Sequence, residues 1–364
     1  MKIAILGTRG IPARYGGFET FAEQLATRLA RGGHEVVVYC LSAFTQPGDE
    51  QRLAAGVRRM IIPSPSSKHF DTLWHGLLSH VHAAFSGVDV VLTCNVANSL
   101  WVWLPRLAGK PVVLNVDGLD RKRKKWNWLG QTFLLFCEAV SALSPSRVVT
   151  DSDSIEQYYL RRYHCRSRMI AYGAEAPASV PGPETFGLEA GRYLLYVSRL
   201  EPENNPELVI RAYSQVQTDW PLVVVGGNPY HPEYVQHLQE IADPRVRLTG
   251  AVYGDGYWTL QKGAGVFVTA FEIGGTHPAL VEAMAAGNAL LYLNTVEGRE
   301  TVADAGLPFE LTVDDLAEKM RTVIGDDALR QRLQERGRAR VAERFSWDAV
   351  TGQYEALFRE LLGK

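Results

Sequence analysis

The sequence lacks the features that would place the protein in a membrane, in an oxidising compartment or on nucleic acid. No apolar run reaches the roughly 20 residues that a transmembrane helix needs, and the first apolar segment ends at Gly7, too early for a secretory signal peptide. The formal net charge of −2 argues against nucleic acid as the main partner. The four cysteines have no metal-ligand spacing, so we expect reduced thiols in a cytoplasmic protein.

The glycine pattern of a dinucleotide-binding fold is also missing. The first predicted strand, residues 2–6, leads into a long turn that contains Gly16 and Gly17 but no GxGxxG, and no acidic residue ends the second strand, residues 35–40. The N–H groups of Gly16 and Gly17 could instead bind a phosphate. The alternative is a flexible surface loop.

A metal site is not expected either. Asp151, Ser152 and Asp153 look like the acidic triplet that binds a metal in some sugar transferases. They follow a predicted strand, residues 147–150, and precede a predicted helix, residues 155–163, so helix capping explains them better.

Two α/β patterns follow one another along the 364 residues, which exceed what a single core usually supports. Apolar runs predict strands at 2–6, 35–40, 88–94, 111–116 and 147–150, and again at 192–197, 221–225, 246–248, 266–269 and 289–293. Residues 174–190 between them lack periodicity and predict a linker. We therefore expect an α/β protein with two Rossmann-like domains, residues 1–172 and 173–345, facing a central cleft, and a late helix at 346–364.

The most informative stretch is residues 271–287. An apolar strand, residues 266–269, precedes Gly274 and Gly275, and helical sequence follows from 279 to 286. Glycines let the backbone approach a ligand closely, and the N–H groups at a helix N-terminus bind anions. We therefore expect a phosphate at this turn, although a plain chain reversal would use the same residues.

Two side chains refine this expectation. Thr276 is a candidate cap for the helix. Glu282 lies about one turn further in, where its carboxylate could accept hydrogen bonds from sugar hydroxyls.

Two charged residues stand where predicted strands end. Asp117 directly follows residues 111–116, and Arg199 follows residues 192–197. Ligands of α/β proteins bind at this carboxyl edge of the sheet. A guanidinium there could neutralise a diphosphate, or Arg199 could simply pair with Glu201 or Glu203.

The densest basic run ends in two tryptophans and is a candidate membrane contact. It comprises Arg121, Lys122, Arg123, Lys124 and Lys125, and Trp126 and Trp128 follow. Basic residues beside tryptophan suit an anionic membrane surface or a lipid-linked diphosphate. The alternative is a solvated face beside ordinary core helices.

Several segments together resemble the GT-B glycosyltransferases of the large retaining group often called family 4, and most closely its rhamnosyltransferase-like branch. They are GTRGIP at 7–12, YGGFET at 15–20, NVDGL at 115–119, PENN at 202–205 and GGT at 274–276 with Pro278. The resemblance implies a GT-B fold whose last helix packs back on the N-terminal domain. It also implies that the C-terminal domain mainly holds a nucleotide-sugar donor and the N-terminal domain mainly holds the acceptor.

The chain departs from the wider family at three positions. The family pairs two glutamates eight residues apart, and counting back from Glu282 gives Gly274, with Glu272 two residues earlier. Asn204 stands where a lysine usually follows the arginine, and Asp117 where many members carry a histidine. These departures resemble the rhamnosyl-type branch and leave Arg199 to neutralise most of the diphosphate charge.

The resemblance implies a role for each site residue. Asp117, Arg199 and Glu272 would act at the reacting sugar and the leaving group. The donor would be bound by Gly16, Gly17, Arg199, Asn204, Gly250, Tyr253, Gly274, Gly275, Thr276 and Glu282. Among these, Glu282 would hold the ribose hydroxyls and Tyr253 would flank the base.

We therefore predict a retaining, metal-independent glycosyltransferase that uses a dTDP- or UDP-sugar, with L-rhamnose from dTDP-rhamnose favoured. Its acceptor would be a glycan or a lipid-linked sugar in cell-surface polysaccharide synthesis. No cofactor is expected, and the protein would be cytoplasmic, with peripheral contact to the inner face of the plasma membrane. Two other classes stay open, a sugar-nucleotide epimerase or hydrolase and a non-enzymatic two-lobed sugar-binding protein.

Overall fold

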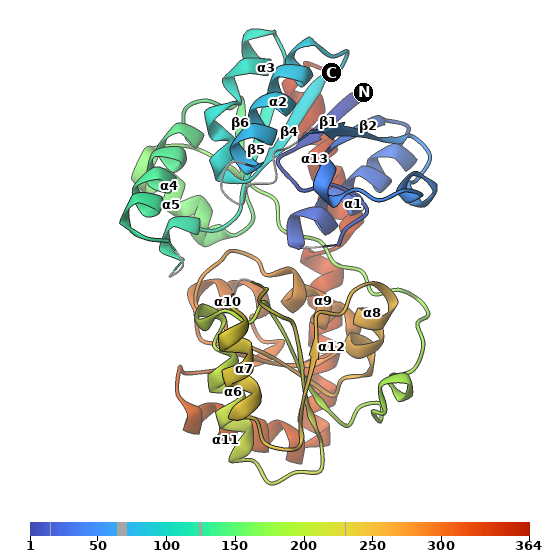
Figure 1. Ribbon diagram of the computed structural model, residues 1–364, viewed down its shortest axis with the longest axis vertical. Coiled ribbons are helices and arrows are strands. Elements are labelled where there is room, and N and C mark those ends of the chain that lie inside the picture. Colours follow the sequence, from blue (N-terminus) through green and yellow to red (C-terminus); the bar gives the residue numbers. More distant parts are fainter. Residues whose placement is uncertain (15, 64–70, 124–125, 230) are drawn as a thin grey trace. The chain divides into compact units, whose positions relative to one another are not determined.

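The chain forms two compact units. The computed structural model describes residues 1–14, 16–63, 71–123, 126–229 and 231–364 (Figure 1). The first unit comprises Met1–Tyr172 and Trp347–Lys364, and the second comprises Gly173–Ser346.

A seven-stranded parallel sheet forms the centre of the first unit, with the strand order β3-β2-β1-β4-β5-β6-β7. Its strands are β1 (Lys2–Leu6), β2 (Glu35–Leu41), β3 (Val57–Ile62), β4 (Val90–Cys94), β5 (Val112–Val116), β6 (Arg147–Thr150) and β7 (Arg168–Met169). Every residue of β4 and β5 is buried, as expected for parallel strands covered on both faces.

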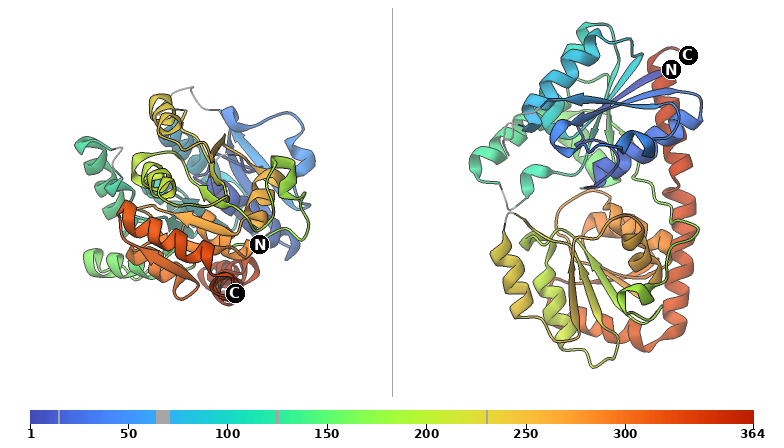
Figure 2. Two further views of the ribbon diagram at one scale, coloured as in Figure 1. Left: turned by 90° about the horizontal axis from the view of Figure 1, so that it is seen from below. Right: turned by 45° about the vertical axis from the view of Figure 1, so that its right-hand side comes forward.

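Helices cover both faces of this sheet (Figures 1 and 2). They are α1 (Gly17–Arg31), α2 (Asp71–Phe85), α3 (Trp103–Leu107), α4 (Trp128–Ser141), α5 (Asp153–Tyr163) and α13 (Trp347–Leu361). Along β1, Ile3 and Ile5 enter one core, whereas Ala4 and Leu6 enter the other, because successive side chains of a strand point to opposite faces.

The last helix, α13, completes the core of the first unit on the face covered by α1. Trp347, Tyr354 and Phe358 are buried there, and the ring centroids of Phe21 and Tyr354 lie 5.5 Å apart. Tyr354 also accepts a hydrogen bond of 2.7 Å from Asn115 of β5. The final residues of the chain are therefore part of the same core as its first strand.

A six-stranded parallel sheet forms the centre of the second unit, in the order β10-β9-β8-β11-β12-β13. Its strands are β8 (Leu194–Val197), β9 (Leu222–Val225), β10 (Val246–Gly250), β11 (Val266–Thr269), β12 (Ala289–Leu293) and β13 (Gly306–Phe309). Its helices are α6 (Pro206–Ser214), α7 (Pro232–Glu240), α8 (Gly254–Gly263), α9 (Pro278–Ala286), α10 (Val296–Val302), α11 (Val313–Gly325) and α12 (Asp327–Arg344).

Both sheets reverse their strand order once, between β1 and β4 in the first unit and between β8 and β11 in the second. This doubly wound arrangement confirms the predicted α/β class with two Rossmann-like domains. Ligands of such sheets bind outside the carboxyl ends of the strands at the point of reversal. A ligand site is therefore expected at those two points.

Some sequence expectations need correction. Residues 174–190 are not a bare linker, because Pro183–Phe186 form a 3-10 turn and Lys262 donates hydrogen bonds to the carbonyls of Pro177 and Ala178 at 2.9 and 3.1 Å. The edge strands β3 and β13 were not predicted, since arginines interrupt the apolar run of β3 and Pro308 interrupts that of β13. Among the described residues, no helix combines the length and apolarity needed to cross a bilayer.

Candidate active site

In the second unit, hydrogen bonds join the turns that follow β8 and β11. Asn205 has a left-handed backbone with φ 55°, and its Nδ2 donates to the carbonyl of Ala270 at 2.8 Å and to Oε1 of Glu272 at 3.1 Å. The N–H of Glu272 donates to the carbonyl of Glu203 at 3.2 Å. The structure thus fixes Glu272 at the point where the strand order reverses. Sequence analysis assigned no role to Asn205.

Arg199 extends from the turn after β8. Its side chain is 44% exposed, and Nη1 lies 3.5 Å from Oε1 of Glu201, so the ion pair considered as an alternative is present. Half-exposed pairs of this kind contribute little free energy. An anionic ligand could therefore compete with Glu201 for the guanidinium.

Asn204 has a different position from the one expected of a donor ligand. It is buried, its Nδ2 donates to the carbonyl of Arg199 at 2.8 Å, and its own carbonyl accepts from the hydroxyl of Tyr196 at 2.6 Å. The Asn204 amide therefore braces the turn that carries Arg199.

The glycine turn after β11 has the backbone that the sequence suggested. Gly274 adopts φ 152°, and a Cβ at this residue would lie 2.2 Å from Nε2 of His277. Gly275 and Thr276 are buried beside it. Thr276 is not the cap of α9: the cap position belongs to His277, because Pro278, which lacks an N–H, takes the first helical position.

Glu282 lies inside α9 and is held by a chain of polar side chains that the sequence analysis missed. The Tyr257 hydroxyl donates to Oε2 of Glu282 at 2.5 Å, Gln261 donates to the Tyr257 oxygen at 2.9 Å, and Asn288 donates to Oε1 of Gln261 at 3.2 Å. Burial raises the pKa of Glu282 to about 7, against the lowering effect of the Tyr257 hydrogen bond. Sequence analysis could not find this series of hydrogen bonds, because Tyr257 in the middle of α8 is not part of a recognisable motif.

The turn after β10 closes the same edge of the sheet. Gly250 has φ 74° and accepts the N–H of Gly226 at 2.9 Å, and Tyr253, 57% exposed, occupies the cap position of α8. A Cβ on Gly226 would lie 1.8 Å from the carbonyl oxygen of Ser198. The backbone is therefore closely packed from β10 across β9 to the turn of Arg199.

In the first unit, the long turn after β1 is anchored by carboxylates of the same unit. The N–H of Arg9 donates to Oε1 of Glu19, and the N–H of Ala13 donates to Oε2 of Glu23, each at 2.9 Å. Burial raises the pKa of Glu19, an effect that hydrogen bonds from the N–H groups of Arg9, Glu19 itself and Gly16 partly offset. The anion at the Gly16 amide in this structure is therefore the Glu19 carboxylate, a residue that sequence analysis left without a role. Gly17 accepts a hydrogen bond from Tyr172 at 3.3 Å through its carbonyl.

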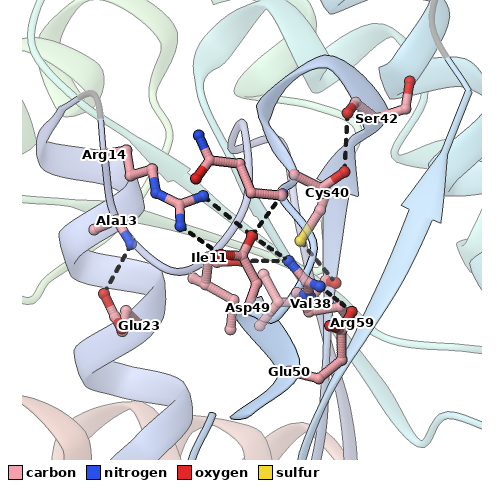
Figure 3. A network of polar contacts seen from close by, with 12 residues as sticks. Ile11, Ala13, Arg14, Glu23, Val38, Cys40, Ser42, Asp49, Glu50 and Arg59 are labelled. Atoms are coloured by element: carbon pink, nitrogen blue, oxygen red, sulfur yellow. Dashed lines mark hydrogen bonds and ion pairs between the residues drawn. The ribbon is translucent and has the colours of Figure 1, made fainter. Parts of the chain in front are cut away.

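A buried network around Asp49 holds the same turn from the other side (Figure 3). Asp49, 2% exposed, accepts hydrogen bonds from Arg14 and from Arg59, the latter at 2.8 Å, and Arg59 also pairs with Glu50. The Arg14 guanidinium, as the largest effect, holds the pKa of Asp49 well below its usual range. The loop is therefore rigidly attached to the sheet through β3.

Asp117 is half-buried directly after β5. Burial raises the pKa of the Cys94 thiol at the end of β4, and the carboxylates of Glu19 and Asp117 raise it further. Both carboxylates therefore lie near the end of β4, at the strand reversal of the first unit.

The residues of the acidic triplet, Asp151, Ser152 and Asp153, lie at the start of α5. Asp151 is buried, Asp153 opens α5, and Ser152 at the cap position makes no side-chain cap hydrogen bond, so the capping interpretation was wrong in that detail. Across the described ranges of the chain, no three His, Cys, Asp or Glu side chains are arranged to hold a metal ion.

Part of the basic run is engaged in ion pairs. Nε of Arg121 lies 3.1 Å from Oε2 of the buried Glu138, and Nε of Arg123 lies 2.8 Å from Oδ1 of Asp120. Lys122 is exposed. Lys124 and Lys125 lie outside the described residues.

Protein-family models match each unit. Residues 15–173 match the model described as Glycosyltransferase Family 4, and residues 185–340 match the model described as Glycosyl transferases group 1. The α-maltose-1-phosphate synthase of Mycolicibacterium smegmatis is 22% identical over 405 residues, covering 99% of this chain and 100% of that protein. The N-acetylgalactosamine-N,N'-diacetylbacillosaminyl-diphospho-undecaprenol 4-alpha-N-acetylgalactosaminyltransferase of Campylobacter jejuni is 27% identical over 177 residues, 47% of each chain.

Solved structures show the same fold. The sucrose-phosphate synthase of Thermosynechococcus elongatus has a TM-score of 0.83 at 22% identity and covers 100% of this chain and 99% of its own. Anabaena HepE in complex with UDP and glucose has a TM-score of 0.80 at 16% identity and covers 99% of this chain and 100% of its own.

These matches define a protein of the two-domain GT-B fold, with a family 4 domain in the first unit and a group 1 domain in the second. The protein is a glycosyltransferase.

Proposed function

We propose that the protein transfers a sugar from a nucleotide sugar to a glycan or a lipid-linked sugar in cell-surface polysaccharide synthesis, with retention of configuration and without a metal. L-rhamnose from dTDP-rhamnose is the favoured donor because of the segments shared with the rhamnosyltransferase-like branch. A UDP-sugar is the second candidate, supported by the UDP in the HepE complex. The observation that carries the proposal is that Asn205 and Glu272 hydrogen-bond across the turns that follow the neighbouring strands β8 and β11, and Arg199 lies in the first of these turns.

The second unit would bind the donor. Arg199 and the N–H groups around Gly275 and Thr276 would neutralise the leaving diphosphate, with the positive end of the α9 dipole behind them. Such preorganised charge is usually the largest catalytic effect, and losing one donor group costs roughly a hundredfold in rate.

The remaining donor contacts follow from the same turns. Glu282 would accept hydrogen bonds from the ribose hydroxyls through Oε1, since Tyr257 donates to Oε2. Glu272 would contact the donor sugar, with its carboxylate oriented by Asn205. Gly250 and Tyr253 would flank the base. Asn204 would act through the backbone of Arg199.

The first unit would bind the acceptor. Asp117 would orient the acceptor hydroxyl or accept its proton as the glycosidic bond forms. Gly16 and Gly17 would contribute to phosphate binding only where the ligand displaces the Glu19 carboxylate, because that carboxylate now accepts the neighbouring N–H groups.

The acceptor proposal includes a location. The Campylobacter relative is named for an acceptor that contains diphospho-undecaprenol, which is a lipid. We propose a cytoplasmic protein that contacts the inner face of the plasma membrane, with the basic run at residues 121–125 facing anionic headgroups.

A thermal-shift screen with dTDP-, UDP- and GDP-sugars tests the donor. The matching donor at about 100 times its dissociation constant should stabilise the protein by roughly 2.7 kcal/mol, and the other bases should not. Product analysis with and without acceptor then separates transfer from donor-only chemistry. Activity should persist in EDTA. Loss of activity on chelation, restored by manganese or magnesium, would overturn the metal-independent proposal.

A further inference from the structure

We propose that Arg121, Glu138 and Tyr158 position the turn that carries Asp117, and through it the acceptor hydroxyl. We call these three residues the Glu138 cluster, because two of them bind the carboxylate of the third. They are positioning residues, since they would act on the reaction through the backbone that follows β5. The inference rests on the proposed function for the role of Asp117 at the acceptor.

Glu138 is the only charged residue of α4, and its carboxylate is fully engaged inside the unit. It is 3% exposed. Oε1 accepts hydrogen bonds from the hydroxyls of Tyr158 at 2.5 Å and Tyr163 at 2.9 Å, and Oε2 accepts from Nε of Arg121 at 3.1 Å. Burial, as the largest effect, raises the pKa of Tyr163, so this hydroxyl keeps the proton that it donates.

Arg121 joins the turn after β5 to two helices. Its Nε donates to Glu138 of α4, and its Nη2 donates to the hydroxyl of Tyr158 of α5 at 2.9 Å. The guanidinium also lies over the Tyr158 ring, 5.8 Å from the ring centroid. A planar guanidinium that makes two directed hydrogen bonds favours one orientation of the backbone that carries it.

The turn that carries Asp117 is held at three points. Val116 is the last residue of β5, Leu119 is buried in the apolar core shared with α4 and α5, and α4 packs against the 3-10 turn Asp120–Lys122 that contains Arg121. Apolar burial at Leu119 is non-directional, so the directed contact comes from Arg121. Asp117 lies between these points, four residues before Arg121.

Stability alone does not account for the Glu138 cluster. Taking a carboxylate out of water costs free energy, and an apolar side chain of similar volume often gives equal or greater stability. The same helix already buries the apolar Leu134 and Cys137. An ion pair with directed hydrogen bonds can instead favour one arrangement of the chain. This arrangement would matter at the turn of Asp117, where the acceptor hydroxyl must be aligned with the donor sugar.

Hydrogen exchange on the full chain, without substrate, tests whether the Glu138 cluster holds the turn. The double variant Arg121→Met/Glu138→Gln removes the ion pair, and the Gln oxygen can still accept from both tyrosines, so no unpaired charge stays buried. Peptides that cover residues 117–123 should exchange about tenfold faster than in the parent protein, because a hydrogen bond to a charged group is lost. The N–H of Lys122, which donates to the carbonyl of Leu119 at 2.9 Å, lies in this range.

Tyr163→Phe is the matched control. It removes a hydrogen bond to the same carboxylate and leaves Arg121 and Tyr158 in place. We expect it to lower the melting temperature without changing the exchange of residues 117–123. A purely structural role of the ion pair would give the same exchange pattern in the double variant and in the control.

Transfer assays then test whether the held turn serves the acceptor. The double variant should lower kcat/KM for the acceptor by about tenfold or more, because a small displacement of an aligning group slows transfer. The dissociation constants of UDP and dTDP, measured by calorimetry, should equal those of the parent protein, because the donor would be bound by the second unit.

Three outcomes would overturn the inference. They are equal exchange of residues 117–123 in the double variant and in Tyr163→Phe, faster exchange with unchanged kcat/KM for the acceptor, and weaker nucleotide binding by the double variant. Absence of transfer by the parent protein would instead contradict the proposed function. The exchange comparison would then still decide whether the Glu138 cluster holds the turn.

Discussion

The two units share a doubly wound sheet but differ in how their polar groups are satisfied at the strand reversal. In the first unit, carboxylates of Glu19 and Glu23 already accept N–H groups from the turn after β1. In the second unit, the corresponding edge presents a half-exposed cation, Arg199, beside a glycine turn and the N-terminus of α9. In the first unit, carboxylates of the unit itself thus accept the N–H groups at the sheet edge, whereas the sheet edge of the second unit is suited to bind an anionic ligand.

The two units also differ in the distribution of their exposed large apolar side chains. Exposed large apolar side chains of the second unit are scattered among Tyr253, Val296 and Leu311 within the described residues. In the first unit most of them lie on α3, on α4 or at Leu143 just after α4, and the others are Phe44, Ile61, Trp74, Phe85 and Leu160. This difference fits the proposed function, in which the second unit would bind the nucleotide-sugar donor and the first unit the acceptor.

The largest expected effect comes from pH, and the buried histidines of the first unit and Glu282 of the second unit contribute with opposite signs. Burial lowers the pKa of His75 and His80 in α2 to about 4 each, below the usual 6.5. The unfolded state therefore binds more protons between these values, and stability should fall as the pH drops from 6.5 to 4, by up to about 3 kcal/mol per histidine.

Glu282 provides the opposite dependence in the second unit. Its folded pKa of about 7 exceeds the usual 4.5, so the folded state binds more protons, and this contribution to stability is lost as the pH rises from 4.5 to 7. Urea unfolding followed by probes in each unit should show the first unit weakening in acid and the second toward neutral pH. Identical pH profiles in both units would remove this distinction.

The next largest effect is expected for Arg199→Ala, which tests whether the Arg199 cation of the second unit stabilises the leaving diphosphate. We expect turnover to fall by roughly a hundredfold or more, because the leaving diphosphate would lose a preorganised cation. The melting temperature should change little, since the Arg199–Glu201 pair is half-exposed. Arg192→Ala, which removes a cation paired with Glu189 and Asp219 on the surface, is the control. Normal turnover in the Arg199 variant would exclude it from the mechanism.

Asp49→Asn tests whether the first unit uses its charges for structure. The change would weaken the interactions of Arg14 and Arg59 with a buried carboxylate, and we expect a loss of about 2 kcal/mol in unfolding free energy. Nucleoside diphosphate affinity, measured by calorimetry, should be unchanged. Glu50→Gln, at an exposed partner of Arg59, should cost less. If the Asp49→Asn variant kept full stability but bound the donor weakly, Asp49 would serve donor binding and not the stability of the first unit.

The smallest expected effect comes from Tyr257→Phe. Removing its hydrogen bond, which lowers the pKa of Glu282, should raise that pKa above about 7 and reduce the fraction of carboxylate at neutral pH. Affinity for the nucleoside diphosphate at pH 7 should drop about tenfold and recover at higher pH, corresponding to a hydrogen bond of roughly 1.4 kcal/mol. Tyr234→Phe on α7 serves as the matched control. A pH-independent loss would assign Tyr257 a purely structural role.

Local patterns explain why much of the fold was predictable. The apolar runs of β4, β5 and β11 and the glycine turn at Gly274 each determine their own conformation, so their positions followed from short stretches of chain. β3 was missed because Arg59 interrupts its pattern, and the ion pairs of Arg59 with Asp49 and Glu50, which lie outside the strand, make that arginine tolerable inside the unit. The cap of α9 was predicted at Thr276, one residue early, because threonine favours a cap position. Pro278 takes the first helical position, so the cap position falls on His277.

The sequence by itself determined the α/β class and which residues stand at strand ends, because strand periodicity and turn residues act over a few neighbouring positions. Tertiary structure decided which of these residues are prepared for a ligand. It engaged the amide of Asn204 with a backbone carbonyl, brought Glu19 to the N–H of Arg9, and placed Tyr257 against Glu282. These contacts depend on burial and on partners far apart in the chain. Burial disfavours the charged form of a carboxylate and raises its pKa, so it changes the protonation state in which the group acts.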